Sequence, residues 1–270
     1  MTINELHEIA LDIMKDIHDC CIENNIQYSL AYGSLIGAVR HQGFIPWDND
    51  IDVWMTRPNF EKFTKIFKSK RGYRLSTEYD KDSLICFNRV YETKRTYLKR
   101  SIKSCDGDVG VWVDIMPLDG VPDNNTERNN QYHDFINKIR PMEAARFWLN
   151  YIDQSKGLKT FYGNVRLLLN NMVNGNYRRI HQKMVEISKR HQFGKYTYCC
   201  YFQCAFAYRK RKQELLPVNA FNTYKLMPFE DTGFMVSKDY DALLTSIYGD
   251  YMKLPPLEDR VFHHGECYWK

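Results

Sequence analysis

The sequence contains no apolar run of about 18 residues, the length that a helix needs to cross the hydrocarbon core of a membrane. It also lacks a charged and then apolar leader of the secretory type before its first amphipathic pattern. Internal repeats and low-complexity linkers are absent as well. We therefore expect a cytoplasmic location, with contact to the inner face of a membrane as the alternative.

No basic stripe interleaved with aromatic residues is present, which argues against a nucleic-acid partner. The net charge of +5, from 38 basic and 33 acidic residues, favours a phosphorylated substrate or an anionic membrane surface. The densest basic cluster, residues 209–212, fits a solvated turn or a contact to a phosphate or lipid headgroup.

The eight cysteines lack the paired C-x2-C spacing of a zinc knuckle. Cytoplasmic thiols stay reduced, so free and buried cysteines are expected. Structural zinc at Cys199, Cys200 and Cys204, with His191, remains the alternative.

The first 120 residues alternate between helical and strand patterns. Thr2 and Glu5 form a capping box for a helix that apolar spacing extends to about Glu23. Further expected elements are a strand at 28–31, a helix at 35–41, a strand at 51–54, a helix beginning near Pro58, and strands at 73–77, 84–91, 96–99 and 109–116, the last ended by Pro117.

The remaining chain is expected to be mainly helical over 121–195, with short strands after Gly194 and a helix over 239–248. These patterns predict an α+β fold with a mixed sheet flanked by helices. Residues 1–120 would form the core, and a mainly helical part over 121–270 would pack on it across a soft boundary.

Two acidic residues, Asp50 and Asp52, are separated by one apolar residue. Alternate side chains of a strand point to the same face, so both carboxylates would crowd together while Ile51 and Val53 enter the core. A hard cation relieves that repulsion, and Mg²⁺ prefers oxygen ligands together with substrate phosphates. We therefore predict that Asp50 and Asp52 bind Mg²⁺, with Mn²⁺ as the alternative.

A third acidic residue, Asp114, lies in an otherwise apolar strand pattern, on the same face as Trp112 and Met116. A buried carboxylate without a partner is costly. Asp114 is therefore expected at the same site, as a third metal ligand or as a proton acceptor. A structural Asp bonded to backbone amides is the alternative.

The dipeptide Gly33-Ser34 is expected to turn the chain into a helix. Backbone amides and a hydroxyl at a helix N-terminus suit phosphate oxygens. Gly33 and Ser34 are therefore predicted to bind the phosphate of a donor, with a plain helix cap as the alternative.

The long motif GSLIGAVRHQGFIPWDNDIDVWMTRPNFEKF, at 33–63, resembles the LicD family of phosphocholine transferases, which includes the fukutin-related proteins. Further similar segments are WVDIMPLDG at 112–120, FED at 229–231 and YGDYMKLPP at 248–256. The resemblance covers nearly the whole chain and implies a nucleotidyltransferase fold.

This resemblance implies transfer of phosphocholine, or of a related phospho-alcohol or aminoethylphosphonate group, from CDP-choline or another CDP-linked donor. The acceptor would be a sugar hydroxyl of a cell-surface glycan or lipid-linked oligosaccharide such as teichoic acid, capsule or lipopolysaccharide. A nucleotidyltransferase acting on a small molecule or protein is the alternative, and a scaffold that binds without turnover is a third reading.

Several residues near these motifs have two readings. Arg40 would bind phosphate in catalysis or pair with Asp48, and Asp48 would be a further ligand or orient its loop. Trp47 would shape the site or pack in the core. Further candidates for the site, each with a structural alternative, are Glu230, Asp231, His263 and His264.

Overall fold

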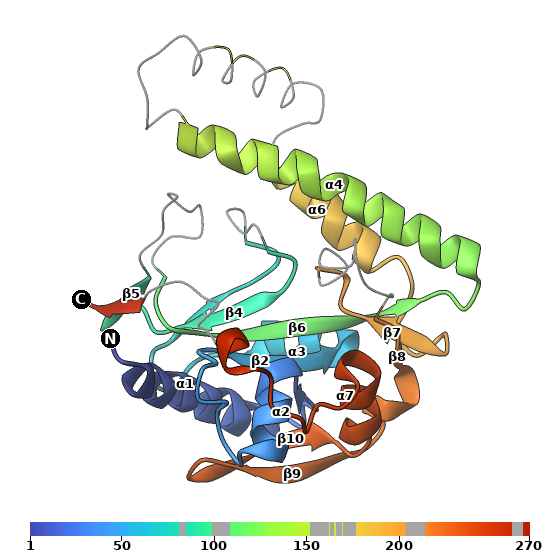
Figure 1. Ribbon diagram of the computed structural model, residues 1–270. Helices are drawn as coiled ribbons and strands as arrows, with labels where there is room; N and C mark the ends of the chain where they lie inside the picture. The colour runs from blue at the N-terminus through green and yellow to red at the C-terminus, as the bar shows by residue number, and fades with distance from the viewer. Residues whose placement is uncertain are drawn as a thin grey trace.

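The computed structural model describes residues 1–80, 85–98, 109–151, 177–203, 214–260 and 267–270, together with Tyr162, Val165 and Leu169. A mixed sheet lies between two groups of helices, with α4 and α6 on one side of β6 and α1 and α2 on the other (Figure 1). The predicted α+β fold with a nucleotidyltransferase-like mixed sheet is confirmed.

The main sheet has seven strands in the described part of the chain, in the order β1-β2-β6-β4-β3, with β7 paired to β6 and β8 paired to β7. Strands β2 and β6 run parallel, and the other neighbours run antiparallel. The bounds are Ser29–Leu30 (β1), Ile51–Thr56 (β2), Arg74–Ser76 (β3), Asn88–Tyr91 (β4), Trp112–Val121 (β6), Tyr198–Cys200 (β7) and Leu216–Pro217 (β8).

Two further antiparallel pairs lie outside this sheet. Strand β5 (Thr96–Leu98) pairs with β11 (Cys267–Trp269), which brings the C-terminus to the first half of the chain. Strands β9 (Tyr224–Phe229) and β10 (Thr232–Ser237) form a hairpin with six paired positions.

The first helix begins where the capping box predicts. Glu5 donates its backbone N–H to the Thr2 hydroxyl at 3.3 Å, and the Glu5 carboxylate accepts the Thr2 N–H at 2.7 Å. The helices are α1 (Ile3–Glu23), α2 (Tyr32–Arg40), α3 (Arg57–Ile66), α4 (Asn125–Tyr151), α6 (Tyr177–Ser188) and α7 (Tyr240–Tyr248), with 3-10 turns η2 (Val218–Phe221) and η3 (Leu257–Asp259). Within the described residues, no helix combines the length and apolar character needed to cross a membrane.

Strand β6 is longer than predicted. It continues through Pro117 to Val121, although proline lacks the N–H that a strand interior normally donates. Its pairing with β4 ends at Ile115, so β4 requires no hydrogen bond from the proline. The expectation that Pro117 ends the strand is therefore wrong.

Two apolar clusters meet at β6. The larger one combines the inner faces of α1, α2, β2 and β6 with buried side chains of the C-terminal part such as Phe229, Phe234 and Leu244. The smaller one joins α4 and α6 around Phe135, and it includes Val121 at the end of β6. Residues on both sides of position 120 thus share one core, and the predicted division there stays a prediction.

Candidate active site

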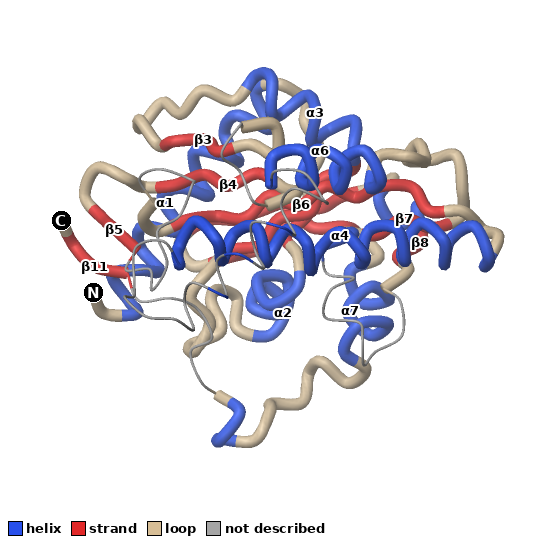
Figure 2. The backbone as a smooth tube through the Cα atoms, turned by 90° about the horizontal axis from the view of Figure 1, so that it is seen from above, coloured by secondary structure: helices blue, strands red, loops and turns tan. Residues whose placement is uncertain are grey.

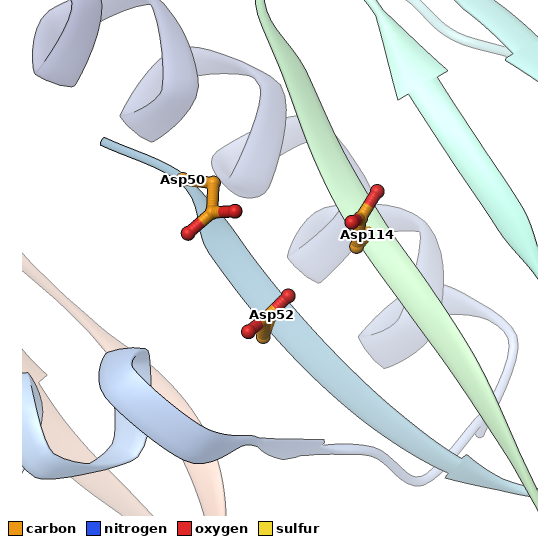
Figure 3. A group of neighbouring side chains, drawn as sticks. All are labelled: Asp50, Asp52 and Asp114. Carbon is orange, nitrogen blue, oxygen red and sulfur yellow. The ribbon is translucent and has the colours of Figure 1, made fainter. Parts of the chain in front are cut away.

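The three predicted carboxylates converge on neighbouring strands. Asp52 of β2 lies directly opposite Asp114 of β6 in the parallel register, and Asp50 precedes β2 by one residue. One oxygen of each carboxylate lies within 4.8 Å of the others. Figure 3 shows the three side chains projecting from the same face of the two strands. The alternation of strand side chains explains this convergence, because Ile51 and Val53 are fully buried on the opposite face.

Crowding and burial disfavour the charged forms of these acids. Asp50 is 6% exposed, and its burial together with the Asp114 charge raises the pKa of the Asp50 carboxyl to about 6. Burial, with the charges of Asp50 and Asp114, raises the pKa of Asp52 well above its usual range. The arrangement therefore costs free energy unless a positive charge is supplied.

The donor set fits Mg²⁺ or Mn²⁺. Carboxylate oxygens are the ligands that these hard cations prefer, and an Mg–O distance of about 2.0–2.1 Å places ligand oxygens roughly 3–4 Å apart. Oxygens already within 4.8 Å reach that spacing by small side-chain rotations. Among the described residues, this is the one group of three or more His, Cys, Asp or Glu side chains close enough to share an ion.

Sequence reasoning missed Arg89, which lies opposite Asp114 on β4. Its guanidinium donates to both carboxylate oxygens of Asp114, through Nε to Oδ1 and through Nη2 to Oδ2, the latter at 3.0 Å. The guanidinium carbon lies 5.0 Å from the ring centre of Phe87 and 5.2 Å from that of Trp112. The sequence offered one signal for this residue. Arg89 lies inside a strand pattern, and the buried Asp114 required a positively charged or hydrogen-bonding partner.

Gly33 and Ser34 lie in the first turn of α2, which begins at Tyr32, three residues earlier than predicted. The first amides of a helix have no partner within that helix, so this turn is suited to oxygens of an anion. The Ser34 hydroxyl accepts the N–H of Asp52 at 2.9 Å and thereby joins α2 to β2. A methyl group on Gly33 would collide with Oδ2 of Asp48, which explains glycine at this position.

The loop between α2 and β2 is fixed by residues far away in sequence. His7 of α1 hydrogen-bonds the Asp48 carbonyl through Nε2 at 2.6 Å, and its ring stacks on Phe44 at 3.9 Å. The Asp48 side chain packs against Gly33 and accepts the Asn49 N–H at 3.1 Å. Asp48 therefore organises the loop beside the three carboxylates.

Arg40, at the end of α2, contacts backbone carbonyls and not Asp48, so the predicted ion pair with Asp48 does not form, while the predicted phosphate contact stays a prediction. Its Nη1 donates to the carbonyl of Tyr251 at 2.7 Å and, more weakly, to that of Lys253 at 3.4 Å. Trp47 is half-buried, and the Arg260 guanidinium lies 5.1 Å from its ring centre. Arg40 and Trp47 both line a groove between α2 and the segment 248–256.

Glu230 and Asp231 form the turn between β9 and β10. Glu230 accepts the N–H of Phe44 at 2.9 Å, and its own N–H donates to the Gln42 carbonyl at 2.7 Å. Asp231 forms an exposed ion pair with Lys15 at 2.9 Å. The structure thus places Glu230 as a support of the 42–44 loop rather than among the three carboxylates. His263 and His264 lie outside the described residues, as do residues 209–212.

The cysteines at 199 and 200 face opposite sides of β7. Cys199 belongs to the larger apolar cluster and Cys200 to the smaller one, so the two thiols point away from a common ligand position. Cys204 lies outside the described residues. Burial raises the pKa of both described thiols well above the usual range, which keeps them protonated.

Comparisons with known proteins bear on this arrangement. A family model described as "LicD/FKTN/FKRP, nucleotidyltransferase domain" matches residues 25–150. That range contains α2, β2 and β6, and hence Gly33, Ser34 and all three carboxylates. The predicted resemblance is confirmed.

Similar curated proteins include the lipopolysaccharide cholinephosphotransferase LicD of Haemophilus influenzae, 29% identical over 98% of this chain and 96% of that protein. An uncharacterized protein of Rickettsia typhi is 38% identical over 33% of this chain and 29% of its own length. One of Rickettsia prowazekii is 31% identical over 41% of this chain and 39% of its own length.

Proposed function

Because the chain belongs through residues 25–150 to the LicD/FKTN/FKRP family, we propose that it transfers phosphocholine from CDP-choline to a sugar hydroxyl of a glycan. The observation that carries this proposal is the cluster of Asp50, Asp52 and Asp114 beside the N-terminal turn of α2. The name of the Haemophilus influenzae relative supports the phosphocholine group and a lipopolysaccharide acceptor. A related phospho-alcohol or aminoethylphosphonate group is the nearest alternative for the transferred group.

In this reaction the acceptor oxygen forms a bond to the phosphorus that carries choline, and the bond from that phosphorus to CMP breaks. CMP leaves with the bonding electrons, and the acceptor hydroxyl gives its proton to a carboxylate of the cluster. The three carboxylates would hold Mg²⁺, which when bound neutralises phosphate charge and lowers the pKa of the attacking hydroxyl.

The surrounding residues orient these groups. The first turn of α2 directs backbone amides at the donor phosphate, and the Ser34 contact fixes that turn against β2. Arg89 holds Asp114 through both oxygens, so the carboxylate keeps one orientation. Phosphoryl transfer depends mainly on such positioning and on charge stabilisation.

A true nucleotidyltransferase is the second candidate, and the description of the matching domain favours it. The two reactions differ in the leaving group. Phosphocholine transfer releases CMP, whereas nucleotide transfer from a nucleoside triphosphate releases pyrophosphate. Analysis of the released product therefore separates the two candidates.

The proposal is tested by CMP release from CDP-choline, with lipopolysaccharide as acceptor and Mg²⁺ present or removed with EDTA. Wild type is compared with Asp50→Asn and with Asp231→Asn, a matched change in an exposed ion pair outside the cluster. We expect metal-dependent release in wild type and Asp231→Asn, and loss in Asp50→Asn. Equal release by Asp50→Asn and wild type would refute the assignment of the metal site.

A panel of CDP-ethanolamine, CDP-glycerol, CDP-ribitol and CDP-aminoethylphosphonate identifies the cargo under the same conditions. Pyrophosphate release from a nucleoside triphosphate, with no CMP from any member of the panel, would establish the second candidate instead.

A further inference from the structure

A groove of about 410 Å³ opens beside the metal-site loop. One wall is a single face of α2, formed by Gly33, Ile36 and Arg40 at helical spacing. The opposite wall is the segment 248–256 after α7, which runs past α2 in both views of the chain (Figures 1 and 2). Trp47 and Ile45 also line the groove, whose volume lies in the range of small-ligand sites.

The groove begins beside the loop that leads to the carboxylate cluster. Gly33 lines its near end and touches the side chain of Asp48, two residues before Asp50. Arg40 lines it seven residues later along α2, which at about 1.5 Å per residue is roughly 10 Å from Gly33. A ligand lying along α2 would therefore reach from the predicted phosphate turn to the Arg40 end, about the length of a nucleoside with its 5′-phosphate.

Aromatic walls often hold quaternary ammonium groups, but the charges at this groove oppose a cation. Arg40 and Lys253 line it, and the Arg260 guanidinium lies 5.1 Å from the ring centre of Trp47. Asp250 is the one acid among the described lining residues. The ring of Trp47 therefore already lies beside a cation.

Two arginines bring positive charge to this region. In the described chain, Arg40 donates to the carbonyls of Tyr251 and Lys253, and Arg260 Nε donates to the Pro255 carbonyl at 3.0 Å while its guanidinium lies over the Trp47 ring. Burial, together with the positive charge of Arg260, lowers the pKa of Arg40. Guanidinium groups so placed are suited to phosphate oxygens and to the acceptor edge of a base.

We propose that this groove binds the nucleotide half of the donor, with the base between Trp47 and Arg40 and with the alkylammonium half directed away from it. This inference rests on the proposed function for the identity of the donor. Arg40, Trp47 and Arg260 would then recognise CMP, the leaving group. CMP would depart along α2.

The test is calorimetric titration of the full chain with CMP in the presence of Mg²⁺. The variants are Arg260→Gln and Trp47→Leu, because Arg40 also supports the opposite wall through its carbonyl contacts. Arg190→Gln is the matched control, since Arg190 pairs with Asp134 on the helical side of the sheet, outside the groove. Unchanged thermal unfolding temperatures verify that the variants are folded.

We expect roughly tenfold or greater loss of CMP affinity in Arg260→Gln and Trp47→Leu and none in Arg190→Gln. Phosphocholine is titrated in parallel and should bind these variants and wild type alike. CMP binding that is equal in all four proteins would overturn the groove assignment while leaving the donor class intact. Phosphocholine binding that is lost in the groove variants would reverse the proposed orientation and overturn it too.

Titration with UMP, AMP and GMP separates a failure of the proposed function from a failure of the groove. If another nucleoside monophosphate binds in place of CMP and needs Arg260 and Trp47, the groove assignment holds and the cytidine donor is wrong. If none of the four nucleotides binds wild type, the groove assignment is overturned.

Discussion

Arg89 of β4 and Asp114 of β6 lie opposite one another in an antiparallel register, and the guanidinium donates to both oxygens of the carboxylate. The same carboxylate lies opposite Asp52 on its other side. Asp114 thus contacts a permanent cation on one neighbouring strand and a like charge on the other.

Replacing Arg89 should weaken Mg²⁺ binding. Arg89→Gln removes the two-point contact that orients Asp114, and loss of such supporting contacts typically costs about 10–100-fold in metal affinity. Arg89→Lys keeps the charge but not the planar fork, so an intermediate affinity is expected. Calorimetric titration with Mg²⁺ measures both variants, with Arg71→Gln as a control in an exposed ion pair. Tighter binding in Arg89→Gln would instead identify Arg89 mainly as a competitor of the metal.

Asp52→Asn should stabilise the metal-free protein and abolish its response to Mg²⁺. The isosteric amide removes one of three crowded carboxyl groups, where desolvation and then repulsion by its neighbours raise the pKa of Asp52. Relief of about 1 kcal/mol would raise the unfolding temperature by roughly 2–4 °C in a chain of this size. Thermal unfolding with EDTA and with Mg²⁺ tests both effects, and transfer activity should be lost. A variant less stable than wild type in EDTA would contradict the repulsion argument.

Arg57→Ala should be strongly destabilising. Arg57 begins α3 and is buried, with Nε and Nη2 donating to Asp119 at 2.7 and 2.6 Å and Nη1 to Glu78 at 2.5 Å. Removing the cation leaves two buried carboxylates uncompensated, which costs roughly 3–5 kcal/mol. Urea denaturation measures this loss, and Arg71→Ala, in an exposed pair, should cost less than about 1 kcal/mol. Similar losses in the two variants would show that the buried network contributes little.

The half-buried histidines of α1 should make the fold sensitive to acid. Partial burial lowers the pKa of both His7 and His18, so the folded state takes up their protons less readily than the unfolded chain does. The unfolded chain binds protons first, below its ordinary pKa of about 6.5, and stability from these groups is therefore full above that pH and declines below it. The free energy of unfolding should fall less between pH 7.5 and 5.5 in His7→Gln/His18→Gln than in wild type. An unchanged pH dependence would exclude the two histidines as its source.

The carboxylate site was predictable because a strand has a period of two. Asp50 and Asp52 are two residues apart on a strand, so their side chains share a face. A carboxylate inside an apolar strand, such as Asp114, requires a polar or charged partner. The residue types and their spacing therefore predicted the cluster that the structure shows. Arg89 was not predictable in the same way, because which strands become neighbours depends on tertiary pairing. The antiparallel register of β4 and β6 places Arg89 at Asp114, and no local pattern encodes it.

The hairpin of β9 and β10 shows a second limit. Its turn contains Glu230 at a positive φ of 52° and not the Asn-Gly or Asp-Gly pair typical of tight hairpins. Glu230 is hydrogen-bonded to Gln42 and Phe44 in this conformation. Long-range contacts therefore hold a turn that the local sequence does not favour. Pro117 shows the same dependence on tertiary structure. A proline fits inside β6 because the pairing with β4 ends before it, at Ile115.

The span that the family model matches is shorter than the unit that builds the site. The matched residues 25–150 contain every carboxylate, yet the loop that delivers Asp50 is bound by His7 from before this span and by Glu230 from beyond it. The matched span therefore contains the reactive groups, whereas their placement depends on contacts from the whole chain. A fragment cut to residues 25–150 would keep the three carboxylates and lose the contacts of His7 and Glu230 that hold their loop.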